Sequence, residues 1–142
     1  MAKKTFNPEG LPIPRGSYFH VAVADPGRVV TIAGQTSSDA DGNIIGAGDV
    51  RSQTREVLRK IQVAIESVGG TIDDIVAVTA YITDTRFYAD VNETRREVFG
   101  PNFPPSTLVQ VVSLARPGLL VEINAMAVVP EASLSACSVT MP

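Results

Sequence analysis

Polar side chains that could do chemistry lie on the last two strand-like segments of the sequence. Glu122 and Asn124 alternate with apolar residues, so the period of two in a strand places both on one polar face. The apolar set comprises Val121, Ile123, Ala125, Ala127 and Val129. A carboxylate on such a face can orient a water and move protons, although most strand glutamates simply face solvent. Ser106 and Thr107 add two hydroxyls that can donate hydrogen bonds.

His20 and Cys137 are the other side chains with reactive groups. His20 is the only histidine and could act as a general base, but it lies two residues from Tyr18 on an alternating segment. A structural hydrogen bond is the interpretation that we favour for it. Cys137 has no companion ligand and no nearby base in the sequence, so we predict neither a metal site nor a nucleophilic cysteine.

The composition favours one soluble domain that does not bind nucleic acid. With 142 residues, 44% hydrophobic and 19% charged, the chain is long and apolar enough to bury a core. A net charge of −3 without any run of Lys or Arg gives no surface that would neutralise phosphates. No apolar run approaches the roughly 20 residues that span a bilayer. The N-terminal residues lack the apolar stretch of a secretory signal, so we expect a cytoplasmic protein.

The elements that must position these residues begin after a proline-rich arm. Residues 1–15 carry three prolines and little periodicity, which predicts an extended arm. Residues 18–24 alternate and residues 28–33 are β-branched, and the Asp25-Pro26-Gly27 sequence between them is typical of a turn. We therefore predict a hairpin of these two segments.

Helices and strands alternate along the rest of the chain. Asp49 can cap a helix whose apolar residues recur every three to four positions, and Gly69-Gly70 can end it. The further elements are predicted at residues 75–82 (strand), 86–99 (helix), 106–112 (strand) and 119–129 (strand). Turn chemistry at residues 115–118 joins the last two strands.

This order of elements predicts an α+β layer fold. Helices that connect strands of one sheet cover one of its faces, and the other face then needs a partner or water. We predict a single domain over residues 1–142, with an arm at 1–15, a core at 16–130 and a tail at 131–142 that the sequence does not place.

Several separated segments together resemble the RidA/YjgF family of reactive-intermediate deaminases. They are Gly16-Ser17-Tyr18-Phe19-His20, Ile32-Ala33-Gly34-Gln35, Asp74-Ile75-Val76, Val91-Asn92-Glu93 and the last two strands. Each segment alone is weak, but their order and spacing are specific. The resemblance implies a chorismate-mutase-like fold, a mixed sheet with two helices on one face, and a homotrimer with a central β-barrel. It also implies ligand clefts between neighbouring subunits.

The resemblance also suggests which residues line the cleft. Glu122 matches the family's water-orienting glutamate, and Tyr18, Gly34 and Asn92 match cleft positions. Tyr18 could instead fill a subunit interface, Gly34 could serve only the geometry of a turn, and Asn92 could bond the backbone. In the deaminases an arginine grips the substrate carboxylate, and here Ser106 occupies that position, with Thr107 beside it. The substrate-binding set is therefore Tyr18, Gly34, Asn92, Ser106 and Thr107, with Glu122 as the catalytic residue.

The function implied is hydrolysis of an enamine or imine of a small metabolite, with release of ammonia. An iminium carbon is already electrophilic, so the reaction needs no metal or cofactor, only a held substrate and an oriented water. Without the arginine we expect a substrate other than the usual 2-imino acids, unless Arg15 or Arg116 holds the anion. The alternative is a non-catalytic trimer that binds metabolites or regulates a partner. RNA cleavage, assigned to some relatives, is opposed by the acidic charge.

Overall fold

A four-stranded mixed sheet forms the centre of the protein. The computed structural model describes residues 3–133. The sheet has the order β3-β6-β4-β5, with β6 antiparallel to both β3 and β4 and with β4 parallel to β5. Its strands are β3 (Arg28–Thr36), β4 (Ile75–Ile82), β5 (Ser106–Gln110) and β6 (Val121–Val129). The predicted mixed sheet is therefore confirmed.

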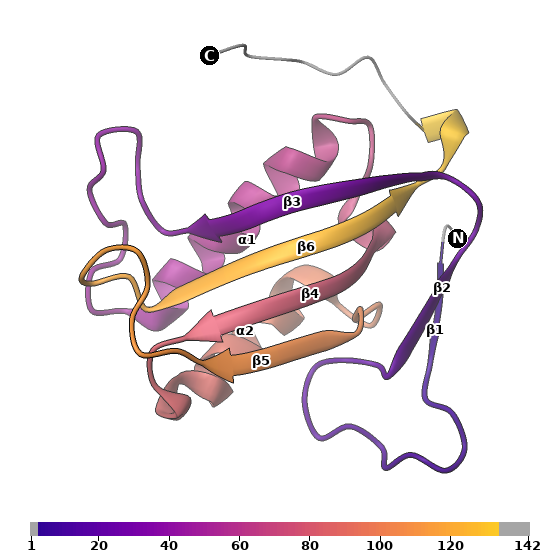
Figure 1. Cartoon of the computed structure of the whole chain (residues 1–142), viewed down its shortest axis with the longest axis horizontal. Helices are drawn as coiled ribbons and strands as arrows, with labels where there is room; N and C mark the ends of the chain where they lie inside the picture. The colour runs from indigo at the N-terminus through magenta and orange to yellow at the C-terminus, as the bar shows by residue number, and fades with distance from the viewer. Residues whose placement is uncertain (1–2, 134–142) are drawn as a thin grey trace.

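Two helices pack on the same face of this sheet (Figure 1). They are α1 (Val50–Glu66) and α2 (Tyr88–Phe99). Asp49 caps α1 as predicted, because its carboxylate accepts the backbone N–H groups of Arg51 and Ser52. Helix α2 follows a short 3₁₀ turn, η2 (Thr85–Phe87). The α+β architecture with two helices on one face agrees with the prediction.

The core lies between α1 and the covered face of the sheet. Leu58 and Ile61 on α1 are fully buried, as are Val121 and Ala127 on β6. Replacing Ile61 with alanine is expected to lower the free energy of unfolding by about 2–5 kcal/mol, because it leaves a cavity in this core. Val63→Ala is the matched control, because Val63 is 55% exposed. Equal losses in denaturant titrations of the two variants would contradict this placement of the core.

The first two strands form a separate sheet, which corrects two predictions. β1 (Lys3–Phe6) pairs antiparallel with β2 (Val21–Ala24). The segment 1–15 is thus more than an extended arm, since it contains β1. The predicted hairpin of residues 18–24 and 28–33 is wrong, because β2 pairs with β1 while β3 pairs with β6. The Lys3 amine ties this small sheet to the main one by donating to the Ile75 carbonyl at 2.6 Å.

The last two strands are not neighbours, which corrects a third prediction, that residues 115–118 close a hairpin. β4 lies between β5 and β6, so residues 115–118 do not close a hairpin. The physical reason is burial. Alternate residues of β6 from Val121 to Val129 are buried, which suits a central strand, whereas Thr107 and Val109 of β5 are exposed at the edge.

Two further short turns complete the described part of the chain. They are η1 (Ile72–Asp74) and η3 (Glu131–Ser133). Most of the predicted tail, including Cys137, lies outside the described residues. Within residues 3–133, no helix has the length and apolar character to cross a membrane.

Candidate functional site

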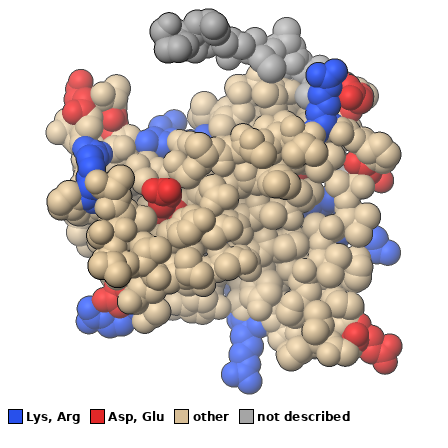
Figure 2. Space-filling view, in the orientation of Figure 1, with Lys and Arg blue, Asp and Glu red and all other residues tan. Residues whose placement is uncertain are grey.

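The face of the sheet opposite the helices carries Glu122 and Asn124, as the alternation predicted. Both side chains are half-buried between fully buried neighbours of β6. Glu122 lies beside Tyr81 of β4 and Thr36 of β3 in the strand register. Figure 2 shows that this face is largely uncharged, with most Lys, Arg, Asp and Glu side chains around its rim. We call it the open face.

Gly34 lies directly against the Glu122 carboxylate. The register of β3 shifts between Ile32 and Gln35, so that β3 bulges opposite β6 at this point. A methyl group added to Gly34 would collide with Oε2 of Glu122 and lie 2.8 Å from its Cδ. The structure therefore brings together two residues that the sequence assigned to the site.

Three polar side chains form a row across the open face next to Glu122. Asn124, Thr79 and Thr107 are register partners on β6, β4 and β5, so their side chains lie on the same side of the sheet. The Asn124 Oδ1 is buried and accepts no hydrogen bond from residues 3–133. Thr107 is exposed at the sheet edge. Asn124 thus offers an unused acceptor beside the predicted catalytic glutamate.

Ser106 faces the opposite side of the sheet from Thr107. Its register partner is Val78, which belongs to the core on the helix side. Ser106 lines a hollow of about 200 Å³ between α2, β5 and the segment before β2. We call this the edge cavity; its lining residues are Tyr18, Tyr88, Asn92, Arg95, Ser106 and Leu108. Three predicted binding residues therefore meet here, without Glu122 or Gly34.

A shallower hollow of about 240 Å³ adjoins the same edge of the sheet. It is lined by Ser106 and Thr107 together, and also by Tyr18 and Thr79. Tyr18 and Ser106 border both hollows. The start of β5, where Ser106 lies, therefore connects the helix side of the sheet with the open face. A ligand at this edge can reach both predicted hydroxyls.

Arg95 is the residue of the edge cavity that the sequence analysis missed. It is only 2% exposed, and its Nη2 donates to the Ser17 carbonyl at 3.1 Å. Its Nε is buried and has no hydrogen-bond partner among residues 3–133. Burial lowers the pKa of the Arg95 guanidinium to about 10, which still leaves it charged at neutral pH. The signal in the sequence that could have pointed to it is its spacing, because Arg95 lies four residues after Val91 and four before Phe99, on the buried face of α2.

The segment that holds Tyr18 is anchored to α2 and to the arm. The Ser17 hydroxyl accepts a hydrogen bond from Arg96 Nε at 2.8 Å and donates to the Asn92 carbonyl at 3.3 Å. His20 Nε2 lies 2.7 Å from the Pro12 carbonyl, and the Tyr18 and His20 rings meet edge to face at 5.7 Å. These contacts agree with a structural role for His20.

The two alternative arginines lie elsewhere on the surface. Arg116 is exposed and donates to the Gly42 carbonyl, and Arg15 is also exposed. Neither lines the edge cavity or the adjoining hollow. Within residues 3–133, no three His, Cys, Asp or Glu side chains are grouped so that they could hold a metal ion.

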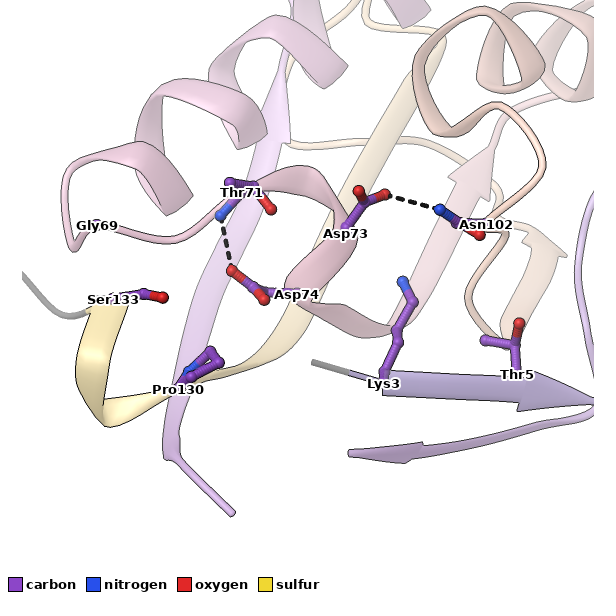
Figure 3. Close-up of a pocket in the computed structure, with 9 residues that line it drawn as sticks. All are labelled: Lys3, Thr5, Gly69, Thr71, Asp73, Asp74, Asn102, Pro130 and Ser133. Atoms are coloured by element: carbon purple, nitrogen blue, oxygen red, sulfur yellow. Dashed lines mark hydrogen bonds between the residues drawn. The ribbon is translucent and has the colours of Figure 1, made fainter. Parts of the chain in front are cut away.

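Another hollow lies beyond the end of β6, next to Pro130 and far along the strand from Glu122. Figure 3 shows the residues that line it. It measures about 290 Å³ and is lined by Lys3, Asp73 and Asp74, among others. Asn102 bonds Asp73, and Asp74 accepts the Thr71 N–H, so both carboxylates are engaged. Burial lowers the pKa of Lys3, while Asp73 and Asp74 oppose that shift. No residue predicted for the site lies here.

Comparison with known proteins covers the whole region that contains the candidate residues. A sequence profile described as Endoribonuclease L-PSP matches residues 10–129. A RutC family protein of Pyrococcus horikoshii is 35% identical over 125 residues, which cover 88% of this chain and 97% of that protein.

Solved structures share the fold. YyfB of Yersinia pestis, described as a protein of unknown function of the conserved Rid family, is 28% identical with a TM-score of 0.82. That match covers 91% of this chain and 100% of YyfB. TdcF of E. coli, solved with bound serine, is 29% identical with a TM-score of 0.65, over 88% of this chain and 98% of TdcF.

Proposed function

Because this chain belongs to the Rid/YjgF family, whose L-PSP profile matches residues 10–129, we propose that it hydrolyses an imine or enamine of a small metabolite. The observation that carries the proposal is the Glu122 carboxylate on the open face. It rests against Gly34 and takes part in no ion pair among residues 3–133. A carboxylate without a cationic partner remains available to a water molecule.

Glu122 performs the proton transfers of this reaction. Its carboxylate orients a water and accepts one proton as the water oxygen bonds to the iminium carbon. The protonated Glu122 then returns this proton to the nitrogen of the carbinolamine. The C–N bond breaks with its electron pair leaving on ammonia, and a carbonyl forms as the hydroxyl proton passes back to the Glu122 carboxylate. Ammonia or solvent finally takes that proton, which restores the carboxylate. Addition of water and loss of ammonia together involve no net oxidation or reduction, so these steps need no redox cofactor.

We further propose that the active unit is a homotrimer with the open faces turned inward around a central β-barrel. The open face exposes Val29, Met126 and Val109 on a surface with little charge at its centre (Figure 2). In one chain, Glu122 and Ser106 line different parts of the sheet, and a cleft between subunits would bring such residues together. Light scattering is expected to give three times the chain mass of 15.0 kDa.

The ligand is proposed to be a small metabolite other than the usual 2-imino acids. The relative TdcF was solved with serine bound, which supports a ligand of that size. Ser106 is neutral and its buried hydroxyl has no partner among residues 3–133, so it can donate one hydrogen bond but supplies no charge.

The test is the hydrolysis of freshly generated 2-iminobutanoate and of neutral imines of similar size, each measured against a buffer blank. We expect the protein to accelerate hydrolysis of at least one of them. Rates equal to buffer across the panel, with a native trimer, would contradict the proposal and favour the metabolite-binding alternative.

Ser106→Arg is expected to raise kcat/KM for 2-iminobutanoate about tenfold. A guanidinium at this position can form the charge-assisted hydrogen bonds with a carboxylate that a serine cannot. Ser113→Arg is the matched control, because it makes the same substitution at an exposed residue beyond β5. If both variants fold and their kcat/KM values for 2-iminobutanoate are equal, the cleft has diverged at more than this position.

A further inference from the structure

We propose that Arg95 on α2 binds a carboxylate of the ligand in the edge cavity, so that this protein holds its substrate's anion from the helix side of the sheet. The inference rests on the proposed function and adds that Arg95, on α2, takes over the anion-binding role that a neutral residue at position 106 cannot fill. It starts from a charged group that is buried without a counterion among the residues the structure describes.

Arg95 has no carboxylate partner in the described part of the chain. The acidic residues of α2 are committed to α1: Asp90 and Glu93 pair with Arg51, and Glu97 pairs with Arg55. Arg95 points to the other side of the helix, and its one hydrogen-bond partner within residues 3–133 is the neutral carbonyl of Ser17. Burying a charge without an opposite charge is unfavourable, and an anionic ligand would remove that penalty.

The edge cavity presents further donors around Arg95. Tyr88, Asn92 and Arg95 follow the spacing i, i+4, i+7, which places them on one stripe of α2. Ser106 closes the cavity from β5, and its buried hydroxyl also has no partner among residues 3–133. Arg95 and Ser106 therefore line one small hollow, and each carries a buried polar atom, Nε or Oγ, that has no hydrogen-bond partner among residues 3–133.

The charge and lining of the edge cavity favour a carboxylate over a phosphate. Arg95 supplies one positive charge, which a singly charged carboxylate neutralises, whereas a phosphate dianion would require more. Tyr18 and Leu108 add apolar walls suited to a short carbon chain. A guanidinium also matches the two oxygens of a carboxylate in geometry.

The test compares 2-oxobutanoate with its neutral analogue 2-oxobutanamide, titrated into the full-length protein by calorimetry. We expect the acid to bind at least tenfold more tightly than the amide. Arg95→Met is expected to abolish this preference, and Arg95→Lys to keep part of it. Arg59→Met is the matched control, since Arg59 is an exposed arginine on α1 that pairs with Glu56 and lines neither the edge cavity nor the adjoining hollow. It should retain the preference in full.

Three results would overturn the inference. One is equal affinity of the wild type for acid and amide, which requires no variant and so does not depend on how Arg95→Met folds. Another is a tenfold preference that survives in Arg95→Met with a native circular dichroism spectrum. The last is that inorganic phosphate binds as tightly as the acid, because the site would then bind anions in general and not carboxylates in particular.

Hydrolysis assays run in parallel separate this inference from the proposed function. Hydrolysis of a neutral imine with no acid preference would leave the function standing and remove the carboxylate site. An acid preference that depends on Arg95, with no hydrolysis of any imine, would keep the site and remove the enzyme.

Discussion

Replacing Glu122 with glutamine is expected to lower kcat/KM for imine hydrolysis by about 10²–10⁴-fold, the usual contribution of a positioned general acid or base. Glutamine keeps the shape of the side chain, and therefore its packing against Gly34, but it cannot accept a proton from water. Steady-state kinetics on the best substrate of the imine panel measure the effect. Because the substitution keeps the shape of the side chain and its packing, the thermal midpoint should stay close to that of the wild type.

Glu93→Gln is the matched control for this experiment. Glu93 lies on α2 in an exposed ion pair with Arg51, so the same chemical change there should alter the rate less than twofold. If Glu122→Gln hydrolysed the imine as fast as Glu93→Gln, another group would have to orient the water. Asn124 would then be the next residue to replace, because it lies two residues from Glu122 in β6 and its buried Oδ1 accepts no hydrogen bond from residues 3–133.

Features set by local sequence were predictable. The Asp49 cap, the 3.6-residue period of α1 and the alternation along β6 each act over a few residues, and all three are present in the structure. Pairing between strands was not predictable in the same way. A turn sequence at Asp25-Pro26-Gly27 reverses the chain, but it does not determine which strand the next segment joins. Here β3 leaves β2 and pairs with β6, nearly a hundred residues later.

The candidate site shows the same division. Alternation placed Glu122 on the open face, and the family resemblance pointed to Gly34, which lies against it. The sequence predicts Ser106 and Thr107 as neighbouring donors, but consecutive strand residues face opposite sides of a sheet. Thr107 therefore lines only the adjoining hollow, whereas Ser106 also lines the edge cavity. Spacing alone could not assign Arg95 to the edge cavity, because its burial depends on how α2 packs against its neighbours and not on the residues beside it in the chain. The spacing of Tyr88, Asn92 and Arg95 identifies the stripe only once α2 is placed against β5.

Gly34→Ala is expected to reduce imine hydrolysis by about 10–100-fold with little loss of stability. The added methyl would overlap the Glu122 carboxylate, and the side chain, being flexible and half-exposed, would swing away instead of straining the backbone. A displacement of about 1 Å at a reacting group can cost about a hundredfold in rate. Gly27→Ala provides the contrast, because its methyl would meet the Val129 carbonyl, 2.8 Å from the carbon, which is backbone and cannot move aside. That variant should lose stability while its folded fraction keeps full activity.

A double-mutant cycle decides whether Gly34 acts through Glu122. If the glycine only makes room for the carboxylate, Gly34→Ala introduced into Glu122→Ala should cause no further loss of activity, so that the two effects are strongly non-additive. If the losses multiplied, Gly34 would serve the ligand directly, through the close approach to its backbone that a side chain would block. In either case, thermal midpoints near that of the wild type must accompany the kinetic data. A collapse of stability in Gly34→Ala alone would show instead that the bulge in β3 cannot tolerate a side chain, and that Gly34 is needed for the sheet before it is needed for the site.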